Sequence, residues 1–384
     1  MGPRIKEIKK VTNKPVFVIG RINDPSVAES LLDDGAGDVI SMARQLIADP
    51  EFANKAREGK AMDIRSCVGV NYCWSYFTRG LRIQCIQNPA VGREKIRGMG
   101  TLSPAEKQRG ILIIGGGAAG LEVARTSALR SHDVLLCEKE KEVGGRLLVE
   151  SRLPGRGEVI KISTWLESQA RKAGAEIKTS EEVTERNIES YIHDRVAIVL
   201  ATGSQVMKMP LTSYLGDVVP GSSSSNVSTF EDVLTGKSRP DGRVLIFDAL
   251  GDVTAIGIAE LLSSRGAEVV LATWSPLVGW ELNQDWTLDY SYEQIAKCGV
   301  RMIANVFMQE IKARSVVLAD VFTGREEETI PADQVVLVSP RLSDNHLTRI
   351  AKEVSKEVHV VGDAVAPRGT YTAIFEGHRL GRAL

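Results

Sequence analysis

A chain of 384 residues is long enough for two or three domains, and its hydrophobic share of 43% and charged share of 25% are ordinary for a globular protein. Its 48 basic and 49 acidic side chains are nearly balanced, which gives no reason to expect nucleic acid or an anionic membrane as a partner. No apolar run approaches a membrane span and the charged N-terminus has no signal-peptide pattern, so we expect a cytoplasmic location.

The first sixty residues alternate between helical and strand patterns. Residues 15–19 form a continuous apolar run, which predicts a strand buried on both faces. Asp24 and Pro25 predict the start of a helix, and residues 38–42 predict a second strand. Two buried parallel strands cannot cover their own apolar faces. Either the sheet continues beyond these strands, or another molecule completes it.

The remaining elements predict an α/β fold. Residues 61–107 are weakly periodic and read as an irregular segment. After it the sequence predicts two strand–helix–strand units, and a turn-rich stretch at residues 220–226 predicts a domain boundary or a hinge. We therefore expect two Rossmann-like nucleotide-binding domains, the first formed by residues 108–235 plus 330–384 and the second by residues 236–329.

The clearest chemical signal is the sequence GGGAAG, which follows a predicted strand and opens a predicted helix. The first glycine allows a tight turn, the second allows a pyrophosphate to approach the backbone, and the third allows close helix packing. Glu138 ends the next strand and can accept a hydrogen bond from a ribose hydroxyl. These residues predict an adenine nucleotide site: Gly115, Gly117, Ala118, Ala119, Gly120 and Glu138.

Three later motifs sharpen this prediction. They are a glycine pair followed by an arginine, the end of a strand, and a Gly-Asp pair before the last helix: Gly145 and Arg146; Ala201, Thr202 and Gly203; Gly362 and Asp363. Their order and spacing resemble the flavoproteins of the disulfide-reductase type, which have two dinucleotide-binding domains. In that family the Gly-Asp pair contacts the ribityl-phosphate region of the flavin. The resemblance implies that these residues bind FAD or ADP.

Cys67, Cys73 and Cys85 are three of only five cysteines and lie close together in the sequence. Thiolates at short spacing suit an iron–sulfur cluster or zinc, while buried unligated thiols are the alternative. The segment CVGVNYC…CIQNPAVG resembles the cluster loop of the trimethylamine dehydrogenase and 2,4-dienoyl-CoA reductase family, in which four cysteines hold a 4Fe–4S cluster. Val70 stands where that family has a cysteine. We therefore expect a 3Fe–4S cluster, a labile 4Fe–4S cluster, or none.

The same family accounts for the N-terminal segment. Gly20 and Arg21, and then Ala43 and Arg44, resemble the last two units of an old-yellow-enzyme barrel, where they would hold the FMN phosphate. The resemblance implies that residues 1–60 are the last two βα units of an incomplete FMN barrel, followed by an iron–sulfur loop and linker at 61–107. A complete barrel needs about 250 residues. We therefore expect a C-terminal fragment of such an enzyme, with its catalytic residues and most of its substrate pocket absent.

The resemblance leaves two branches of function open. In the amine-dehydrogenase branch, electrons from a small-molecule substrate pass from FMN through the cluster to an electron-transferring flavoprotein. In the reductase branch, FAD and NAD(P)H serve the reduction of an enoyl thioester. The stretches at 286–290 and 366–368 favour the amine branch. A non-catalytic nucleotide-binding module is the alternative of another class, and in either case we expect a homo-oligomer.

The second unit lacks the glycine fingerprint. Asp248, Leu250 and Val253 occupy the three positions that correspond to the glycines of the first unit. A carboxylate at the first position would repel a pyrophosphate. We expect this domain to be a scaffold without a nicotinamide site, and we expect at least two of the nearby aromatic residues to be core: Trp280, Trp286, Tyr290 and Tyr292.

Overall fold

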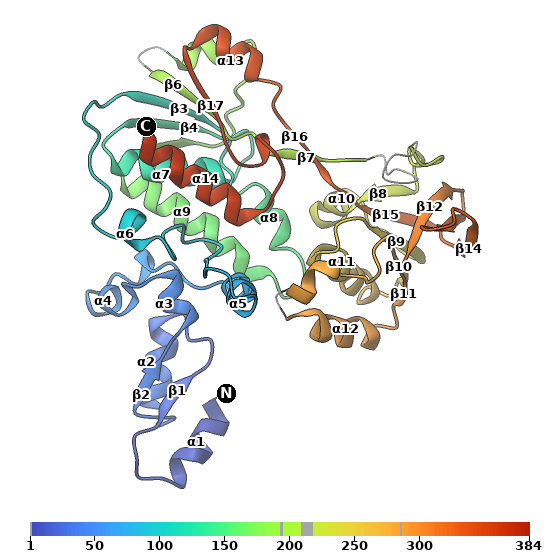
Figure 1. The fold of residues 1–384 in the computed structure, drawn as a ribbon, viewed down its shortest axis with the longest axis horizontal. Helices are drawn as coiled ribbons and strands as arrows, with labels where there is room; N and C mark the ends of the chain where they lie inside the picture. Colours follow the sequence, from blue (N-terminus) through green and yellow to red (C-terminus); the bar gives the residue numbers. More distant parts are fainter. Residues whose placement is uncertain (1, 193–194, 209–217, 285) are drawn as a thin grey trace.

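The computed structural model describes residues 2–192, 195–208, 218–284 and 286–384. Figure 1 shows a narrow N-terminal arm, a first α/β unit above it and a second α/β unit beside the first. Among the described residues no helix is both long enough and apolar enough to cross a membrane.

The arm contains one pair of parallel strands with helices beside them. Its elements are α1 (Gly2–Lys10), β1 (Phe17–Ile19), α2 (Pro25–Asp33), β2 (Val39–Ser41), α3 (Arg44–Ala48) and α4 (Phe52–Arg57). In the parallel pair Val18 lies opposite Ile40. The α2 helix begins as predicted, because the Asp24 side chain accepts a hydrogen bond from the Ser26 N–H and Pro25 occupies the first turn.

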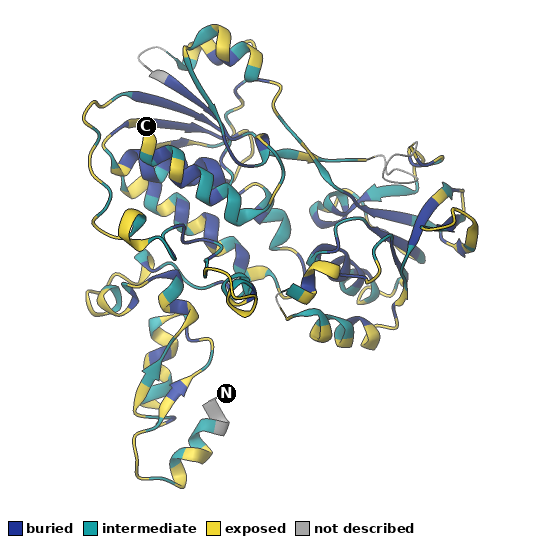
Figure 2. Cartoon of the chain, viewed as in Figure 1, coloured by how far each residue is buried: buried dark blue, intermediate teal, exposed yellow. Residues whose placement is uncertain are grey.

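The prediction that the first strand is buried on both faces is wrong. Val18 is 1% exposed, but Phe17 and Ile19 are 62% and 59% exposed. The arm is correspondingly rich in exposed and half-exposed positions in Figure 2. Helices cover one side of β1 and β2 only, so the other side keeps its apolar side chains in solvent.

The segment between the arm and the first unit is mostly irregular, as predicted, but it contains short helices. These are η1 (Ala61–Asp63), α5 (Tyr72–Thr78) and α6 (Glu94–Arg97). The α5 helix begins after Asn71, whose φ of 56° is left-handed. Cys73 therefore lies in a helix and not in a loop.

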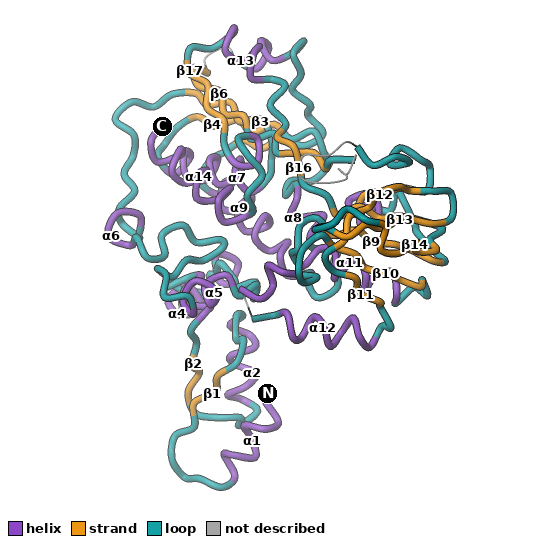
Figure 3. Tube along the Cα trace, turned by 45° about the vertical axis from the view of Figure 1, so that its right-hand side comes forward, coloured by secondary structure: helices purple, strands orange, loops and turns teal. Residues whose placement is uncertain are grey.

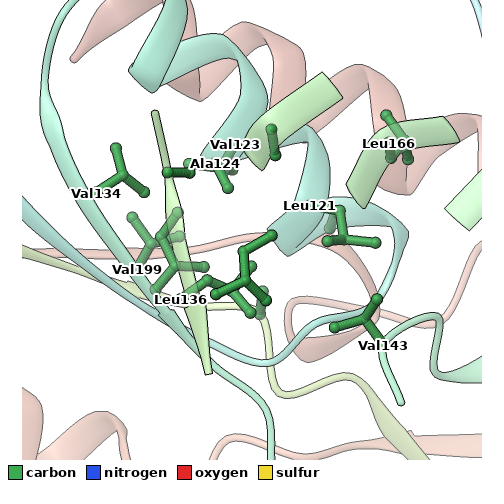
Figure 4. Close-up of a cluster of buried hydrophobic side chains, with 14 of the residues drawn as sticks. Leu121, Val123, Ala124, Val134, Leu136, Val143, Leu166 and Val199 are labelled. Carbon is green, nitrogen blue, oxygen red and sulfur yellow. The ribbon is translucent and has the colours of Figure 1, made fainter. Parts of the chain in front are cut away.

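The first unit is built on a parallel sheet with the order β17-β6-β3-β4-β5. The strands are β3 (Gly110–Ile114), β4 (Asp133–Cys137), β5 (Glu176–Lys178), β6 (Arg195–Leu200) and β17 (Glu357–Val360). One face packs against helices α7 (Ala118–Leu129), α9 (Ile160–Lys172) and α14 (Thr370–Ala383). The core of this face is shown in Figure 4, where Leu121 and Val123 of α7 lie near Leu136 of β4. The opposite face packs against α13 (Thr348–Val354) and the region of η3 (Ile188–Tyr191).

The second unit has a parallel sheet with the order β11-β10-β9-β15-β8. Its strands are β8 (Val227–Thr229), β9 (Arg243–Asp248), β10 (Glu268–Thr273), β11 (Arg301–Ile303) and β15 (Gln334–Val338). One face packs against α10 (Phe230–Thr235), α11 (Val253–Ser263) and α12 (Leu288–Lys297). The other packs against an antiparallel sheet that the sequence did not predict, visible in Figure 3: β12 (Val306–Ile311), β13 (Ser315–Asp320) and β14 (Glu326–Pro331).

The strand pairing corrects the predicted domain boundaries. Strands β8 and β15 lie outside residues 236–329, yet β15 pairs with both β8 and β9 in the second sheet. The two units are joined by a short antiparallel pair, β7 (Ser204–Val206) and β16 (Arg341–Ser343). The remaining short helices are α8 (Arg146–Glu150), η2 (Gly157–Val159), η4 (Trp280–Gln284) and η5 (Gly362–Ala364).

Candidate functional site

The glycine turn connects β3 to α7, and its three glycines have different surroundings. Gly115 has a φ of +108°, and a Cβ there would lie 2.3 Å from the Ala201 carbonyl oxygen. A Cβ at Gly120 would lie 2.0 Å from the Gly115 carbonyl oxygen. A Cβ at Gly117 would meet no atom within 4 Å. The first and third glycines are therefore required by the fold, while the second leaves space open beside the backbone.

That open space lies at the N-terminus of α7. Gly117 caps the helix and supplies no side-chain hydrogen bond to its first N–H groups. Free N–H donors at a helix N-terminus, next to a backbone without a Cβ, suit the approach of a phosphate. The residues present therefore fit the diphosphate group of an adenine nucleotide such as ADP or FAD.

Glu138 lies beside the same turn. One carboxylate oxygen accepts a hydrogen bond of 2.6 Å from the Gly116 N–H, and the other accepts one of 2.9 Å from the Glu140 N–H. Each carboxylate oxygen has a second acceptor position. Glu138 thus shapes the turn and can still accept from a ribose hydroxyl.

The other predicted nucleotide-binding motifs gather around this turn. The Gly144 N–H donates to the Gly116 carbonyl oxygen at 2.8 Å, and a Cβ at Gly145 would lie 3.4 Å from the Gly117 Cα. A Cβ at Gly362 would lie 2.8 Å from the Ala119 Cβ. Arg146 Nη1 is 3.7 Å from Asp363 Oδ2. Ala201 adjoins Gly115, and the sequence continues through Thr202 and Gly203 into β7.

The residues predicted to hold the FMN phosphate line one pocket. It lies at the carboxyl ends of β1 and β2 and is formed by Ile19, Gly20, Arg21, Ile22, Asn23, Ser41, Met42, Ala43, Arg44, Gln45, Cys67 and Gly69. Both arginines are already paired within the chain: Arg21 lies 2.5 Å from a Glu158 carboxylate oxygen, and Arg44 donates to the Asn71 side-chain oxygen at 2.6 Å. The pocket fits the phosphate end of FMN, provided that these side chains exchange those partners for the phosphate.

Two residues missed in the sequence connect this pocket to the cysteine segment. Gln45 accepts from the Cys67 N–H at 2.8 Å and donates to the Arg65 carbonyl at 3.1 Å. Asn23 donates to the Cys67 carbonyl at 2.9 Å. Both side chains are amides whose partners lie twenty or more residues away in the sequence, so no local pattern marks them.

Cys67, Cys73 and Cys85 line a second hollow together with Val70 and Asn71. Burial raises the pKa of the Cys85 thiol to about 11, and burial with the proximity of Cys67 raises the pKa of the Cys73 thiol. Within the described part of the chain, no three His, Cys, Asp or Glu side chains are arranged to hold a metal ion. Val70 supplies no thiolate and packs against the first core, so the donor set does not fit a cluster held by four cysteines.

In the corresponding turn of the second unit, the Asp248 side chain occupies the backbone N–H groups that a phosphate would need. Asp248 is fully buried, and one carboxylate oxygen accepts from the N–H groups of Leu250 and Gly251 at 3.0 and 2.8 Å. The Gly251 carbonyl accepts from the Glu281 N–H at 2.9 Å, which holds η4 over the turn. A Cβ at Gly251 would be 3.5 Å from both the backbone N and the Cβ of Trp280.

The aromatic residues near this turn are more exposed than predicted. Tyr292 is half-buried against the core and donates to the Val278 carbonyl at 2.9 Å. Trp280, Trp286 and Tyr290 are all exposed. The prediction that at least two of the four are core is therefore wrong.

Comparison with known proteins identifies the family. Residues 109–363 match the model of the pyridine nucleotide-disulphide oxidoreductase family, and residues 3–63 match that of the NADH:flavin oxidoreductase / NADH oxidase family. The chain belongs to the pyridine nucleotide-disulphide oxidoreductase family. With the N-terminal match, this confirms the resemblance to the trimethylamine dehydrogenase and 2,4-dienoyl-CoA reductase family of flavin-dependent oxidoreductases.

Three relatives show how much of the family's length the chain spans. An NADH oxidase from Thermoanaerobacter brockii is 31% identical over 364 residues, covering 94% of this chain and 54% of that protein. The amine oxidase HisD, which acts on 6-hydroxypseudooxynicotine in Pseudomonas geniculata N1, has a TM-score of 0.93 and 29% identity over 99% of this chain and 58% of that one. Histamine dehydrogenase from Rhizobium sp. 4-9 has a TM-score of 0.90 and 28% identity over 99% and 60%. This chain therefore spans little more than half the length of these relatives.

Proposed function

We propose that this chain is the nucleotide-binding and electron-exit part of an amine-dehydrogenase-like flavoprotein, which passes electrons to a protein acceptor of the electron-transferring flavoprotein kind. The similarity to HisD and histamine dehydrogenase supports the amine branch. Relatives named NADH oxidase and cinnamate reductase belong to the same set, so family membership alone does not choose between the branches.

The closed turn of the second unit is the observation that carries the proposal. A nicotinamide dinucleotide needs backbone N–H groups free to meet its pyrophosphate. Here the Asp248 carboxylate already accepts from the N–H groups of Leu250 and Gly251, and η4 covers the same turn. A phosphate would have to displace a buried carboxylate and move η4. An acceptor other than NAD(P)⁺ is therefore favoured.

The glycine turn of the first unit, by contrast, is open to a nucleotide. Its turn is open at Gly117, and Glu138 and Arg146 lie beside it. We assign it an adenine nucleotide, FAD or ADP. When bound in the arm pocket, FMN would supply the chemistry that accepts electrons from substrate, with Arg21 and Arg44 as the phosphate ligands. The proposed electron path includes no four-cysteine cluster, because Val70 replaces the fourth thiolate.

Exposed aromatic side chains offer a surface for the protein acceptor. Trp74 and Phe77 of α5 are exposed with ring centroids 5.5 Å apart, and Trp280 and Trp286 are exposed on the second unit. Arg79 at the end of α5 donates to the Gln284 side chain of η4 at 2.7 Å, so the two parts of this surface are in direct contact. Exposed aromatic groups of this kind are typical of protein interfaces.

The test is an anaerobic titration of the purified protein with NADH and with NADPH. We expect neither micromolar binding by calorimetry nor rapid bleaching of bound flavin. Micromolar binding or rapid flavin reduction by either would reject the proposal in favour of a 2,4-dienoyl-CoA reductase-like enzyme. A colourless protein that releases only ADP on denaturation would instead support a non-catalytic nucleotide-binding module.

A further inference from the structure

Arg341 is the first residue of β16 and has a buried donor without a partner. Its side chain is 8% exposed. Nε donates to the Ser204 hydroxyl at 2.9 Å, and Nη2 donates to the Ser204 carbonyl at 3.0 Å and to a Glu231 carboxylate oxygen at 3.5 Å. Nη1 is buried and has no acceptor among the residues that the structure describes.

An unpaired charged donor in the interior is costly. Leaving a buried hydrogen-bonding group without a partner costs about 1–3 kcal/mol, and more when the group is charged. The other nitrogens of this guanidinium are held in place by Ser204, so rotation of the side chain would break bonds that it now makes. The orphan donor therefore points to an acceptor that arrives with a ligand.

The position of Arg341 relates this donor to the nucleotide site of the first unit. The Ser204 hydroxyl, which accepts from Arg341, lies 3.2 Å from Asp363 Oδ2, to which it can donate. Asp363 in turn lies 3.7 Å from Arg146 Nη1. Arg146 follows Gly145, which adjoins Gly117 of the open turn. Polar contacts thus connect the β7–β16 joint to Arg146, and Gly145, the residue before it, lies against the backbone of the glycine turn.

We propose that Arg341 Nη1 donates a hydrogen bond to an oxygen of the nucleotide bound at the glycine turn, so that the nucleotide reaches the joint between the two units. This rests on the proposed function only in placing FAD or ADP in the first unit. Both nucleotides carry the same diphosphate chemistry, and FAD adds a flavin with ring oxygens beyond it. Arg341 is a binding residue in this role, and the bound nucleotide ties β16 to the first unit.

The experiment measures binding of ADP and of FAD to nucleotide-free protein by isothermal titration calorimetry. Arg341→Gln removes the Nη1 donor and the charge, and Arg341→Lys keeps the charge without the guanidinium geometry. Arg349→Gln, on the exposed face of α13, is the matched control. We expect Arg341→Gln to weaken binding about tenfold or more, as for the loss of a charge-assisted hydrogen bond, and Arg349→Gln to change it less than twofold.

The two ligands locate the acceptor. Weaker binding of both ADP and FAD places the acceptor on the diphosphate, and weaker binding of FAD alone places it on the flavin end. Unchanged binding of both would overturn the inference and leave water as the partner of Nη1. Wild-type protein that binds neither ligand would overturn the proposed nucleotide site together with this inference.

A second variant keeps the test informative if Arg341→Gln does not fold. Ser204→Ala removes the hydroxyl that holds Arg341 Nε and leaves the arginine in place. We expect this variant to lose less affinity than Arg341→Gln does. Its melting temperature should rise less on adding nucleotide than that of the wild type. A nucleotide-induced rise equal to that of the wild type in both Ser204→Ala and Arg341→Lys would also reject the inference.

Discussion

The carboxylate of Asp248 accepts a hydrogen bond of 2.8 Å from the N–H of Gly251, three residues later in the same turn. Its second oxygen is buried and has no hydrogen-bond partner within the described part of the chain. Burial raises the pKa of this carboxyl to about 6, although the N–H donors oppose the change and nearby Asp252 adds to it. The side chain that closes the second nucleotide turn is therefore ionised at a cost to folding.

Asp248→Asn should change the pH dependence of stability. Because the pKa of Asp248 in the folded state lies above its unfolded value, its ionisation lowers stability as pH rises from about 4 through 6. Between pH 5 and pH 7.5 we expect the wild type to lose about 1–2 kcal/mol that Asp248→Asn does not lose. Urea unfolding at the two pH values measures the difference.

Asp333→Asn provides the control for that experiment. Hydrogen bonds from the paired Arg243 lower the pKa of Asp333 to about 2. Its contribution to stability is present above pH 4 and is lost only as pH falls toward 2. Asp333→Asn should therefore reduce stability equally at pH 5 and pH 7.5. If the Asp248→Asn profile runs parallel to that of the wild type, the carboxyl does not titrate in this range.

Gly117→Val should separate nucleotide binding from folding. A Cβ at Gly117 meets no atom within 4 Å, and φ of −74° with ψ of −177° is allowed for valine. We expect Gly117→Val to fold with a wild-type circular dichroism spectrum and to copurify with no nucleotide, as measured by mass spectrometry of the denatured extract. Retention of stoichiometric nucleotide would show that the assignment of this turn is wrong.

Gly120→Ala is the contrasting variant of the same turn. Its Cβ would lie 2.0 Å from the Gly115 carbonyl oxygen, a backbone atom that cannot move without opening the turn. We expect little folded protein from this variant. Its failure to fold beside a folded Gly117→Val protein would show that the two glycines have different roles, as the fingerprint predicts.

Local patterns predicted the parallel sheets well. The continuous apolar runs of β3 and β9 lie in strands that are almost completely buried, and the glycine turn follows β3 directly. Strand β14 was missed because exposed positions interrupt its apolar pattern, whereas β13 is a continuous buried apolar run that was overlooked in the sequence. Strand β1 was predicted, but its burial was not, because burial depends on neighbours that local sequence does not specify.

Contacts between distant residues could not be predicted from the sequence. Ser204 and Arg341 are 137 residues apart, and neither belongs to a recognisable motif. The Glu281 N–H holds η4 over the Asp248 turn by a hydrogen bond to Gly251. Gln45 is linked to Cys67 by an ordinary hydrogen bond from the backbone N–H to the side-chain amide oxygen. The fingerprint gave the location of the first nucleotide site. The joint next to it emerged only from the pairing of β7 with β16.

The exposed face of the arm should cause association. Phe17 and Ile19 precede and follow the buried Val18 in β1, and both side chains are exposed to solvent. We expect wild-type protein to self-associate with rising concentration in light-scattering chromatography, and Phe17→Ser/Ile19→Thr to shift it toward monomer with unchanged ADP binding. Val18→Ser is the control, because it should unfold the arm and increase protease cleavage within residues 1–60. A monodisperse, protease-resistant wild-type monomer would contradict this expectation.

Val70→Cys should supply the thiolate that the cysteine segment lacks. Val70 lines the same hollow as Cys67, Cys73 and Cys85, and it occupies the position at which the resembling family has its remaining cysteine. After anaerobic reconstitution with iron and sulfide, we expect wild-type protein to hold fewer than four irons per chain and Val70→Cys to hold four. Iron and sulfide analysis with electron paramagnetic resonance after reduction measures both.

Val68→Cys is the control for position, because Val68 is also valine in the same hollow but is buried in the first core. It adds a thiol without completing the ligand spacing of the family, so its iron content should match that of the wild type. Val70→Cys/Cys73→Ser should return the iron content to the wild-type level, because it again offers three thiols. A stable four-iron cluster at full occupancy in the wild type would show that a ligand other than cysteine completes the site.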